Sequence, residues 1–148
     1  MSAYPGTWPG RARTWPLTRE ARQRLDSEIA ELRDELTSLT TRGLEEGIVM
    51  LPVALASRRL DTLKQVLAAA EVVTDPGCAA IGRRVRLREE SGEMLSRSLV
   101  YPGDGDPRRG RISADSPLGS AILGARAGDT VEVEAPAGRW SVTLLSVE

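Results

Sequence analysis

Two adjacent glutamates, Glu45 and Glu46, stand between two glycines, Gly43 and Gly47. Carboxylate oxygens are ligands that Mg²⁺ prefers, and an accessible pair of them could contact a metal ion that lies in another protein. The alternative is that a turn in water is polar by default, without any function. These residues alone leave both interpretations open.

The rest of the chain offers no self-contained active site. It has no histidine, and its single cysteine, Cys78, therefore has no histidine to activate it as a nucleophile. Glycine-rich phosphate loops and the motifs CxxC, HExxH and GxSxG are all missing. The loop 103–106 resembles part of a calcium loop but lacks the ligand at position 12. We therefore expect no enzymatic activity of its own, no cofactor and no stable metal site.

Heptad patterns on both sides of the glutamates predict the elements that position them. The apolar residues before them, spaced four, three, four and three, are Leu25, Ile29, Leu32, Leu36 and Leu39. The apolar residues after them, spaced three, four, three, four and three, are Val53, Ala56, Leu60, Leu63, Leu67 and Ala70. Such spacing is typical of coiled coils, and a short connection favours an antiparallel pair. The sequence thus predicts a helical hairpin over residues 17–73 with its tip at about 43–51.

Local signals suggest where these two helices begin and end. Thr18 is the expected N-cap of the first helix. Gly43 and Gly47 are expected to bracket the tip, because glycine commonly ends helices. Pro52 fits the first turn of the second helix, which we expect to run to about Glu71.

A different periodicity begins at residue 79. Apolar and polar residues alternate in several short runs, as in Val131–Val133 and around Val142, and a turn at 136–138 predicts a hairpin. A short helix is expected over about 117–123. The fold class is therefore α+β, with an antiparallel coiled-coil hairpin and an antiparallel β-sheet domain over 79–148. Residues 74–78 are the expected linker.

Residues 1–16 are rich in proline and glycine and are expected to form an irregular N-terminal arm. Trp8 and Trp15 in this arm either cover an apolar patch of the protein or anchor a partner. The sequence does not decide between these two roles.

Composition narrows the classes of function. The chain of 148 residues has 20 basic and 21 acidic residues and a net charge of −1, which argues against broad binding to a phosphate backbone. Any nucleic-acid function should therefore be indirect. No apolar run is long enough to span a membrane, and the lone Cys78 is compatible with a reducing cytoplasm. We expect a cytoplasmic monomer.

The C-terminal third resembles bacterial Gre transcript-cleavage factors. The similarity is carried by the runs 116–124, 127–133 and 135–138, which read SPLGSAILG, AGDTVEV and APAG. Residues 59–73 also resemble the closing helix of that family, and residues 17–32 resemble its opening helix. The resemblance covers nearly the whole chain except residues 1–16.

This resemblance implies a coiled-coil hairpin and an FKBP-like sheet domain. It also implies that the sheet domain docks on the β′ subunit's coiled coil at the rim of the RNA polymerase secondary channel, with Asp115, Ser116, Pro117 and Leu118 as the contact residues. The hairpin would enter the channel. In cleavage factors, acids at the tip help to hold a second Mg²⁺, so that the polymerase cuts its own backtracked RNA.

The tip departs from the family pattern. Gly43 stands where cleavage factors carry an essential aspartate, Leu44 and Glu46 match the pattern, and Gly47 replaces an asparagine. The hairpin is also several residues shorter. We therefore favour a channel-binding regulator that inhibits or modulates RNA synthesis without efficient cleavage. The alternatives are a cleavage-stimulating factor that uses Glu45 and Glu46, the Rnk-like branch with its shorter coiled coil, and a generic adaptor or FKBP-type isomerase.

Overall fold

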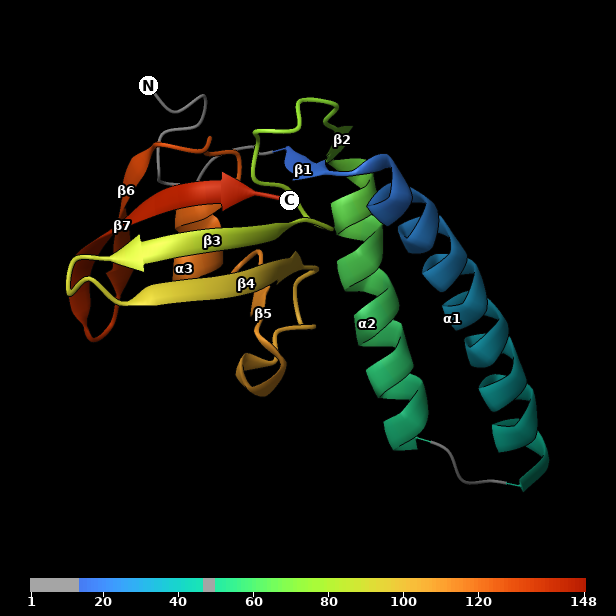
Figure 1. Cartoon of the computed structure of the whole chain (residues 1–148). Helices are drawn as coiled ribbons and strands as arrows, with labels where there is room; N and C mark the ends of the chain where they lie inside the picture. The colour runs from blue at the N-terminus through green and yellow to red at the C-terminus, as the bar shows by residue number, and fades with distance from the viewer. Residues whose placement is uncertain (1–13, 47–49) are drawn as a thin grey trace.

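A helical hairpin projects from a curled sheet domain in the computed structural model (Figure 1). The structure describes residues 14–46 and 50–148, although the side chains of residues 44–46 and 50 lie outside this description. Trp8, Gly47 and the rest of the segments 1–13 and 47–49 likewise lie outside the described residues. This arrangement confirms the expected α+β class.

Helix α1 (Arg19–Glu46) and helix α2 (Met50–Ala68) form the hairpin. The Thr18 hydroxyl accepts a hydrogen bond from the Ala21 amide at 3.0 Å, which confirms the predicted N-cap. The heptad seam is buried most completely near the sheet domain, where Leu25 and Leu63 are inaccessible to solvent. Further along α1, the seam residues Leu36 and Leu39 are only partly buried. No helix within the described ranges is long and apolar enough to cross a bilayer.

Two expected helix ends were wrong. Gly43 does not end the first helix, because α1 continues to Glu46. A glycine inside a helix costs only about 1 kcal/mol relative to alanine and does not prevent helix continuation. The second helix ends at Ala68 rather than Glu71, because Ala70–Val72 form the short strand β2.

Strand β2 pairs in parallel with β1 (Trp15–Leu17). Trp15 and Pro16 therefore belong to a strand, which corrects the expectation of an irregular arm through residue 16. The Trp15 amide donates to the Ala69 carbonyl at 2.8 Å, and the Val73 amide donates to the Leu17 carbonyl at 3.0 Å. Trp15 packs against the hydrophobic core, in agreement with the first of its two proposed roles.

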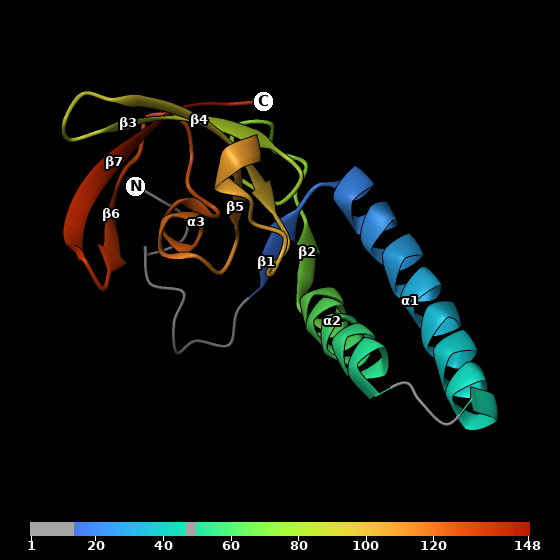
Figure 2. The same cartoon turned by 90° about the horizontal axis from the view of Figure 1, so that it is seen from below.

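Five strands form the main sheet, in the order β5-β4-β3-β7-β6. They are β3 (Arg84–Glu89), β4 (Met94–Val100), β5 (Arg111–Ser113), β6 (Thr130–Ala135) and β7 (Gly138–Val147). The sheet curls around α3 (Pro117–Ile122), as Figure 2 shows. The hairpin turn between β6 and β7 is confirmed.

The sequence predicts a purely antiparallel sheet, but the observed sheet is mixed. Strand β5 lies parallel to β4 at one edge. The ten residues between these two strands include the 3-10 helix η1 (Pro107–Arg109). They carry the chain back along β4, so that β5 can run in the same direction as β4.

One hydrophobic core extends through both parts of the molecule. Leu17 and Leu63 from the N-terminal part, Leu99 and Leu144 from the sheet, and Ile122 from α3 are each at most 1% exposed and belong to the same cluster. The hairpin base is thus packed into the sheet domain. This shared core fixes the direction in which the hairpin projects.

Close packing at Gly82 brings the start of α1 against the sheet domain. Gly82 has a φ of 99°, and a Cβ atom at this position would lie 2.6 Å from the Thr18 hydroxyl oxygen and 2.9 Å from the Ala21 Cβ. The neighbouring Tyr101 hydroxyl donates a hydrogen bond to the Ala21 carbonyl. Burial raises the pKa of Tyr101 to about 12.

Candidate functional site

The two glutamates lie at the end of the hairpin that is farthest from the sheet. Glu45 and Glu46 are the last two residues of α1, which at 28 residues is about 40 Å long. Only residues 47–49 separate this helix from α2. The connection between the helices is therefore shorter than the expected tip at 43–51, because residues 43–46 and 50–51 are helical.

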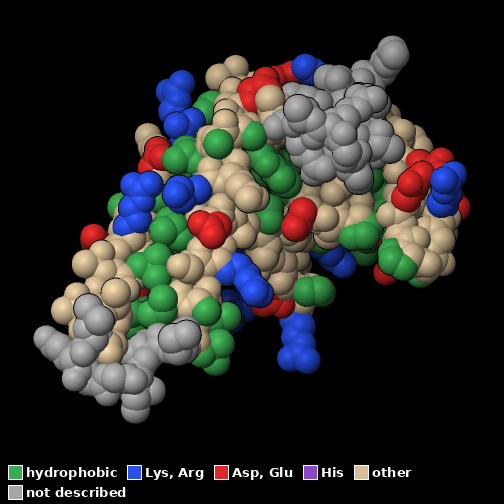
Figure 3. Space-filling model, turned by 180° about the vertical axis from the view of Figure 1, so that it is seen from behind, with side chains coloured by type: hydrophobic (Ala, Val, Ile, Leu, Met, Phe, Trp, Pro, Cys, Tyr) green, Lys and Arg blue, Asp and Glu red, His purple; other side chains and the backbone are tan. Residues whose placement is uncertain are grey.

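Apolar side chains near this tip were missed by the sequence interpretation. Leu51 and Leu55 in the first turns of α2 are 68% and 57% exposed. They are four residues apart and thus share one side of the helix. Figure 3 shows hydrophobic side chains on the hairpin close to the grey residues at its end. The signal that could have revealed them is that both leucines fall outside the heptad seam.

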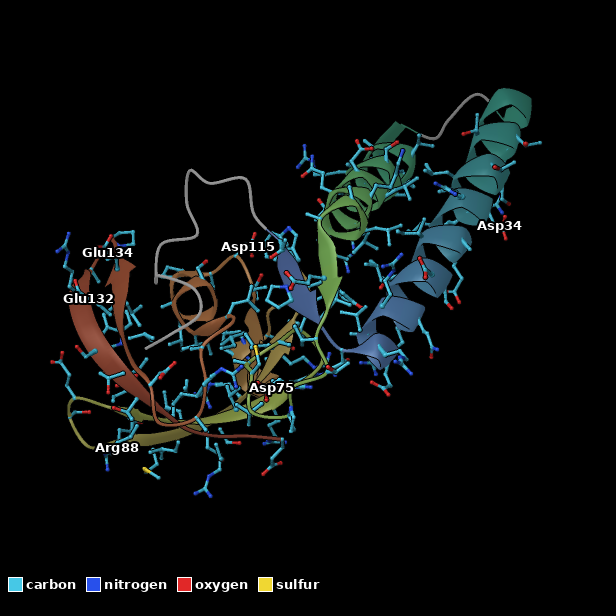
Figure 4. The ribbon with its side chains drawn as sticks, turned by 90° about the horizontal axis from the view of Figure 1, so that it is seen from above. Asp34, Asp75, Arg88, Asp115, Glu132 and Glu134 are labelled. Atoms are coloured by element: carbon cyan, nitrogen blue, oxygen red, sulfur yellow. The ribbon has the colours of Figure 1, made fainter. Side chains whose placement is uncertain are left out.

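The four expected docking residues lie together at the start of α3. Asp115 and Pro117 are exposed, whereas Ser116 and Leu118 are half-buried. The Ser116 hydroxyl accepts from the Gly119 amide at 3.0 Å, so Ser116 is the N-cap of α3. The same hydroxyl donates to the Ser113 carbonyl at 2.7 Å. Asp115, labelled in Figure 4, accepts a hydrogen bond from the Ser113 hydroxyl.

Gly119 allows this corner to form. A Cβ atom at this position would lie 2.0 Å from the Ser113 carbonyl oxygen, which is far inside van der Waals contact. Glycine is therefore required for α3 to approach β5 this closely. Asp115 and Pro117 are presented to solvent by a corner that is itself tightly packed.

The expected linker is fastened to the sheet domain. The Asp75 carboxylate accepts from the Gly77 amide at 2.9 Å and forms an ion pair with Arg126. The Gly77 hydrogen bond is the main reason that the pKa of Asp75 lies below its usual value, and Arg126 contributes in the same direction. Arg83 donates to the carbonyls of Asp75 and Cys78. Burial raises the pKa of the Cys78 thiol, so it is not an activated nucleophile.

A three-way contact of Arg59 joins both helices to the sheet domain. Its guanidinium donates to the Pro102 carbonyl at 2.7 Å, to Asp104 at 2.8 Å and to Glu28 at 3.2 Å. Glu28 belongs to α1, Arg59 to α2, and Pro102 and Asp104 to the loop after β4. The sequence interpretation did not find this contact, because its partners are at least 31 residues apart.

The structure does not bring the tip and docking residues together. Glu45 and Glu46 are at one end of the molecule, and Asp115–Leu118 lie beside the sheet (Figures 1 and 4). No three His, Cys, Asp or Glu residues gather into a possible metal site within the described part of the chain.

Known proteins resemble this chain over most of its length. Residues 74–148 match the family model of the C-terminal part of the transcription elongation factor GreA/GreB. A transcription elongation factor GreA from Chloroflexus aurantiacus is 34% identical over 149 residues, covering 88% of this chain and 95% of the relative. A GreA from Bacillus anthracis is 27% identical over 154 residues, covering 92% and 98% of the two chains.

Two solved structures are also similar to this chain. The crystal structure of Thermus aquaticus Gfh1 is 27% identical, with 93% of this chain and 99% of that chain covered and a TM-score of 0.44. A prokaryotic GreA/GreB factor from Nitrosomonas europaea is 29% identical, with 90% and 98% covered and a TM-score of 0.47. The family model and the 34% identity to a full-length relative establish that this chain belongs to the GreA/GreB family of transcription elongation factors.

Proposed function

We propose that this chain binds RNA polymerase at the rim of the secondary channel and inserts its hairpin, inhibiting or modulating RNA synthesis without efficient transcript cleavage. The observation that carries the proposal is the form of the tip. Helix α1 runs without interruption through Gly43, where cleavage factors carry an aspartate, and only three residues connect it to α2. One of the two acids of the resembled tip is therefore missing.

Docking is assigned to the corner formed by Asp115, Ser116, Pro117 and Leu118. Asp115 and Pro117 are exposed and can contact the β′ coiled coil, while Ser116 holds the helix start. The shared core and the Arg59 contact support a hairpin that keeps one direction while the corner is bound.

A second function is cleavage stimulation of the GreA type. It is favoured by the presence of two acidic residues, Glu45 and Glu46, at the end of α1, and by the GreA names of the relatives. The polymerase's Mg²⁺ would supply the charge that stabilises the attacking and leaving oxygens of the cleaved phosphodiester. Our preference for the first function rests on the missing acid at Gly43.

The two functions are separated by adding the protein to backtracked elongation complexes and measuring RNA length. Reduced RNA synthesis without shortening supports the proposal, whereas rapid shortening contradicts it. Docking is tested separately by co-purification of the polymerase with Asp115→Lys. The matched control is Glu93→Lys, which makes the same change of charge at an exposed residue of the β3–β4 turn.

A further inference from the structure

The outer face of the main sheet carries a row of arginines along its central strand. Arg84, Arg86 and Arg88 alternate along β3 with the buried Val85 and Leu87, so all three point to the side opposite the core. They are two residues apart and thus about 7 Å apart along the strand. In Figure 4 the Arg88 side chain points away from α3.

One carboxylate residue lies beside this row, because the backbone of Glu148 exchanges two hydrogen bonds with that of Arg84. Within the described part of the chain none of the three arginines forms an ion pair, and the Arg84 side chain donates only to the Ser96 hydroxyl at 2.8 Å. Glu132 and Glu134 lie at the far edge of the sheet, where both pair with Arg139 at 3.4 and 3.1 Å. The charge of the row is therefore available to a partner.

Further donors extend this basic face across the sheet. In register with Arg84 lie Ser98 on β4 and then Arg111 on β5. Arg111 lines a hollow of about 340 Å³ at the hairpin base, together with Arg24 of α1 and with Asp104, whose carboxylate is paired with Arg59. Arg111 and Arg24 are exposed, and neither forms an ion pair within the described ranges.

Hydroxyl groups occupy most of the remaining positions of this face. Ser96 and Ser98 flank the row on β4, and Thr143 and Ser146 flank it on β7. Serine and threonine hydroxyls, like arginine, are common donors to phosphate oxygens. The one large apolar side chain in register with the row, Met94, is at its margin opposite Arg88.

We propose that this face, defined by Arg84, Arg86, Arg88, Arg111 and Arg24, binds the phosphate backbone of single-stranded RNA. A protein partner would be expected to find an apolar or aromatic centre, which this face lacks. The absence of aromatic side chains from its central strand also means that bases are not stacked, so binding is independent of sequence. The choice of RNA rests on membership of a transcription elongation family, but not on the proposed mode of action.

This face and the docking corner can be occupied at the same time. Helix α3 packs on the inner side of the curled sheet (Figure 2), whereas the arginine row lies on the outer side. A partner held at Asp115 and Pro117 therefore leaves the row exposed. This proposal differs from the expectation, drawn from the net charge, that any nucleic-acid contact is indirect.

The test measures binding of the full chain to a fluorescently labelled oligouridylate by anisotropy, over a range of KCl concentrations. Each phosphate contact on a single strand contributes about −0.7 to the slope of log K against log salt. The variant Arg84→Glu/Arg86→Glu/Arg88→Glu should lose binding, and Arg86→Ala should reduce the slope by about 0.7. The matched control, Arg33→Glu/Arg58→Glu/Arg108→Glu, changes three exposed arginines elsewhere that form no ion pair among the described residues, and it should retain most of the binding.

Several outcomes would overturn the proposal. One is that the natural chain does not bind the oligouridylate at low salt. Another is that the row variant and the control lose binding to the same extent. A third is that duplex DNA or polyglutamate binds more strongly than the oligouridylate. Circular dichroism establishes that the triple variant is folded, and Arg86→Ala supplies the test if it is not. Because polymerase is absent, this outcome is independent of whether the proposed channel function holds.

Discussion

Arg59 on α2 and Asp104 on the loop after β4 are joined by an ion pair of 2.8 Å, which fastens the hairpin to the sheet domain. The same guanidinium contacts Glu28 on α1 and the Pro102 carbonyl. One side chain thus links three segments that are distant in the sequence. The direction of the hairpin depends on this contact together with the shared core.

Replacing Arg59 should weaken this junction. In Arg59→Ala the Pro102 carbonyl loses a charged donor at a partly buried site, and a hydrogen bond to a charged group contributes about 1.5–3 kcal/mol. The ion pairs add little, since partly exposed pairs contribute about 0–1 kcal/mol. Urea denaturation measures the free energy of unfolding. The control is Arg58→Ala, at an exposed neighbour that forms no ion pair in the described part of the chain, and equal stability of the two variants would contradict the account.

Gly119→Ala should disrupt the docking corner. The added methyl group would lie 2.0 Å from the Ser113 carbonyl oxygen, and overpacking against backbone costs about 3 kcal/mol or more. A large fall in the melting temperature is expected. Gly77→Ala is the matched control, because its nearest neighbour atom would be 3.5 Å away. A small effect at Gly119 would show that α3 can move away from β5.

The buried Tyr101 predicts a loss of stability at high pH. Its pKa is raised from 10.0 to about 12, so the folded state favours the protonated hydroxyl. The contribution is complete below pH 10 and is lost as the pH rises to about 12, with a total of about 2–3 kcal/mol. In Tyr101→Phe this part of the alkaline destabilisation should be absent. Denaturation curves at pH 9 and pH 11 for both proteins measure it, and identical pH dependence would contradict the assignment.

Much of the fold was predictable because its signals are local. The heptad spacing places Leu25 and Ile29 in the seam, and Thr18 caps α1 as expected. The two-residue turn between Ala135 and Gly138 also follows from sequence. Each of these features depends on residues within a few positions of one another.

The features that were missed depend on distant partners. Ala70 continues the heptad spacing of α2, yet it lies in β2 because β1, 55 residues earlier, offers a parallel strand. The Arg59 contact and the parallel β5 have the same origin. Gly43 misled the prediction in another way. Glycine often ends a helix, but its cost inside a helix is small, and α1 continues through this position.

The candidate site was predictable only in part. The corner at Asp115–Leu118 and the glutamates at 45 and 46 were proposed from the family resemblance, and both sets remain predictions. The alternation of Arg84, Arg86 and Arg88 with apolar residues is visible in the sequence. The exposure of Leu51 and Leu55, and the lack of ion pairs of these arginines among the described residues, are not, because exposure and pairing are properties of the folded chain.

The most direct test of the central claim is the length of RNA in backtracked elongation complexes after this protein is added. We predict reduced extension on nucleotide addition and no shortening of the RNA, with the effect lost in Asp115→Lys but retained in Glu93→Lys. Rapid shortening that disappears in Glu45→Ala/Glu46→Ala would contradict this account and would identify the protein as a cleavage-stimulating factor.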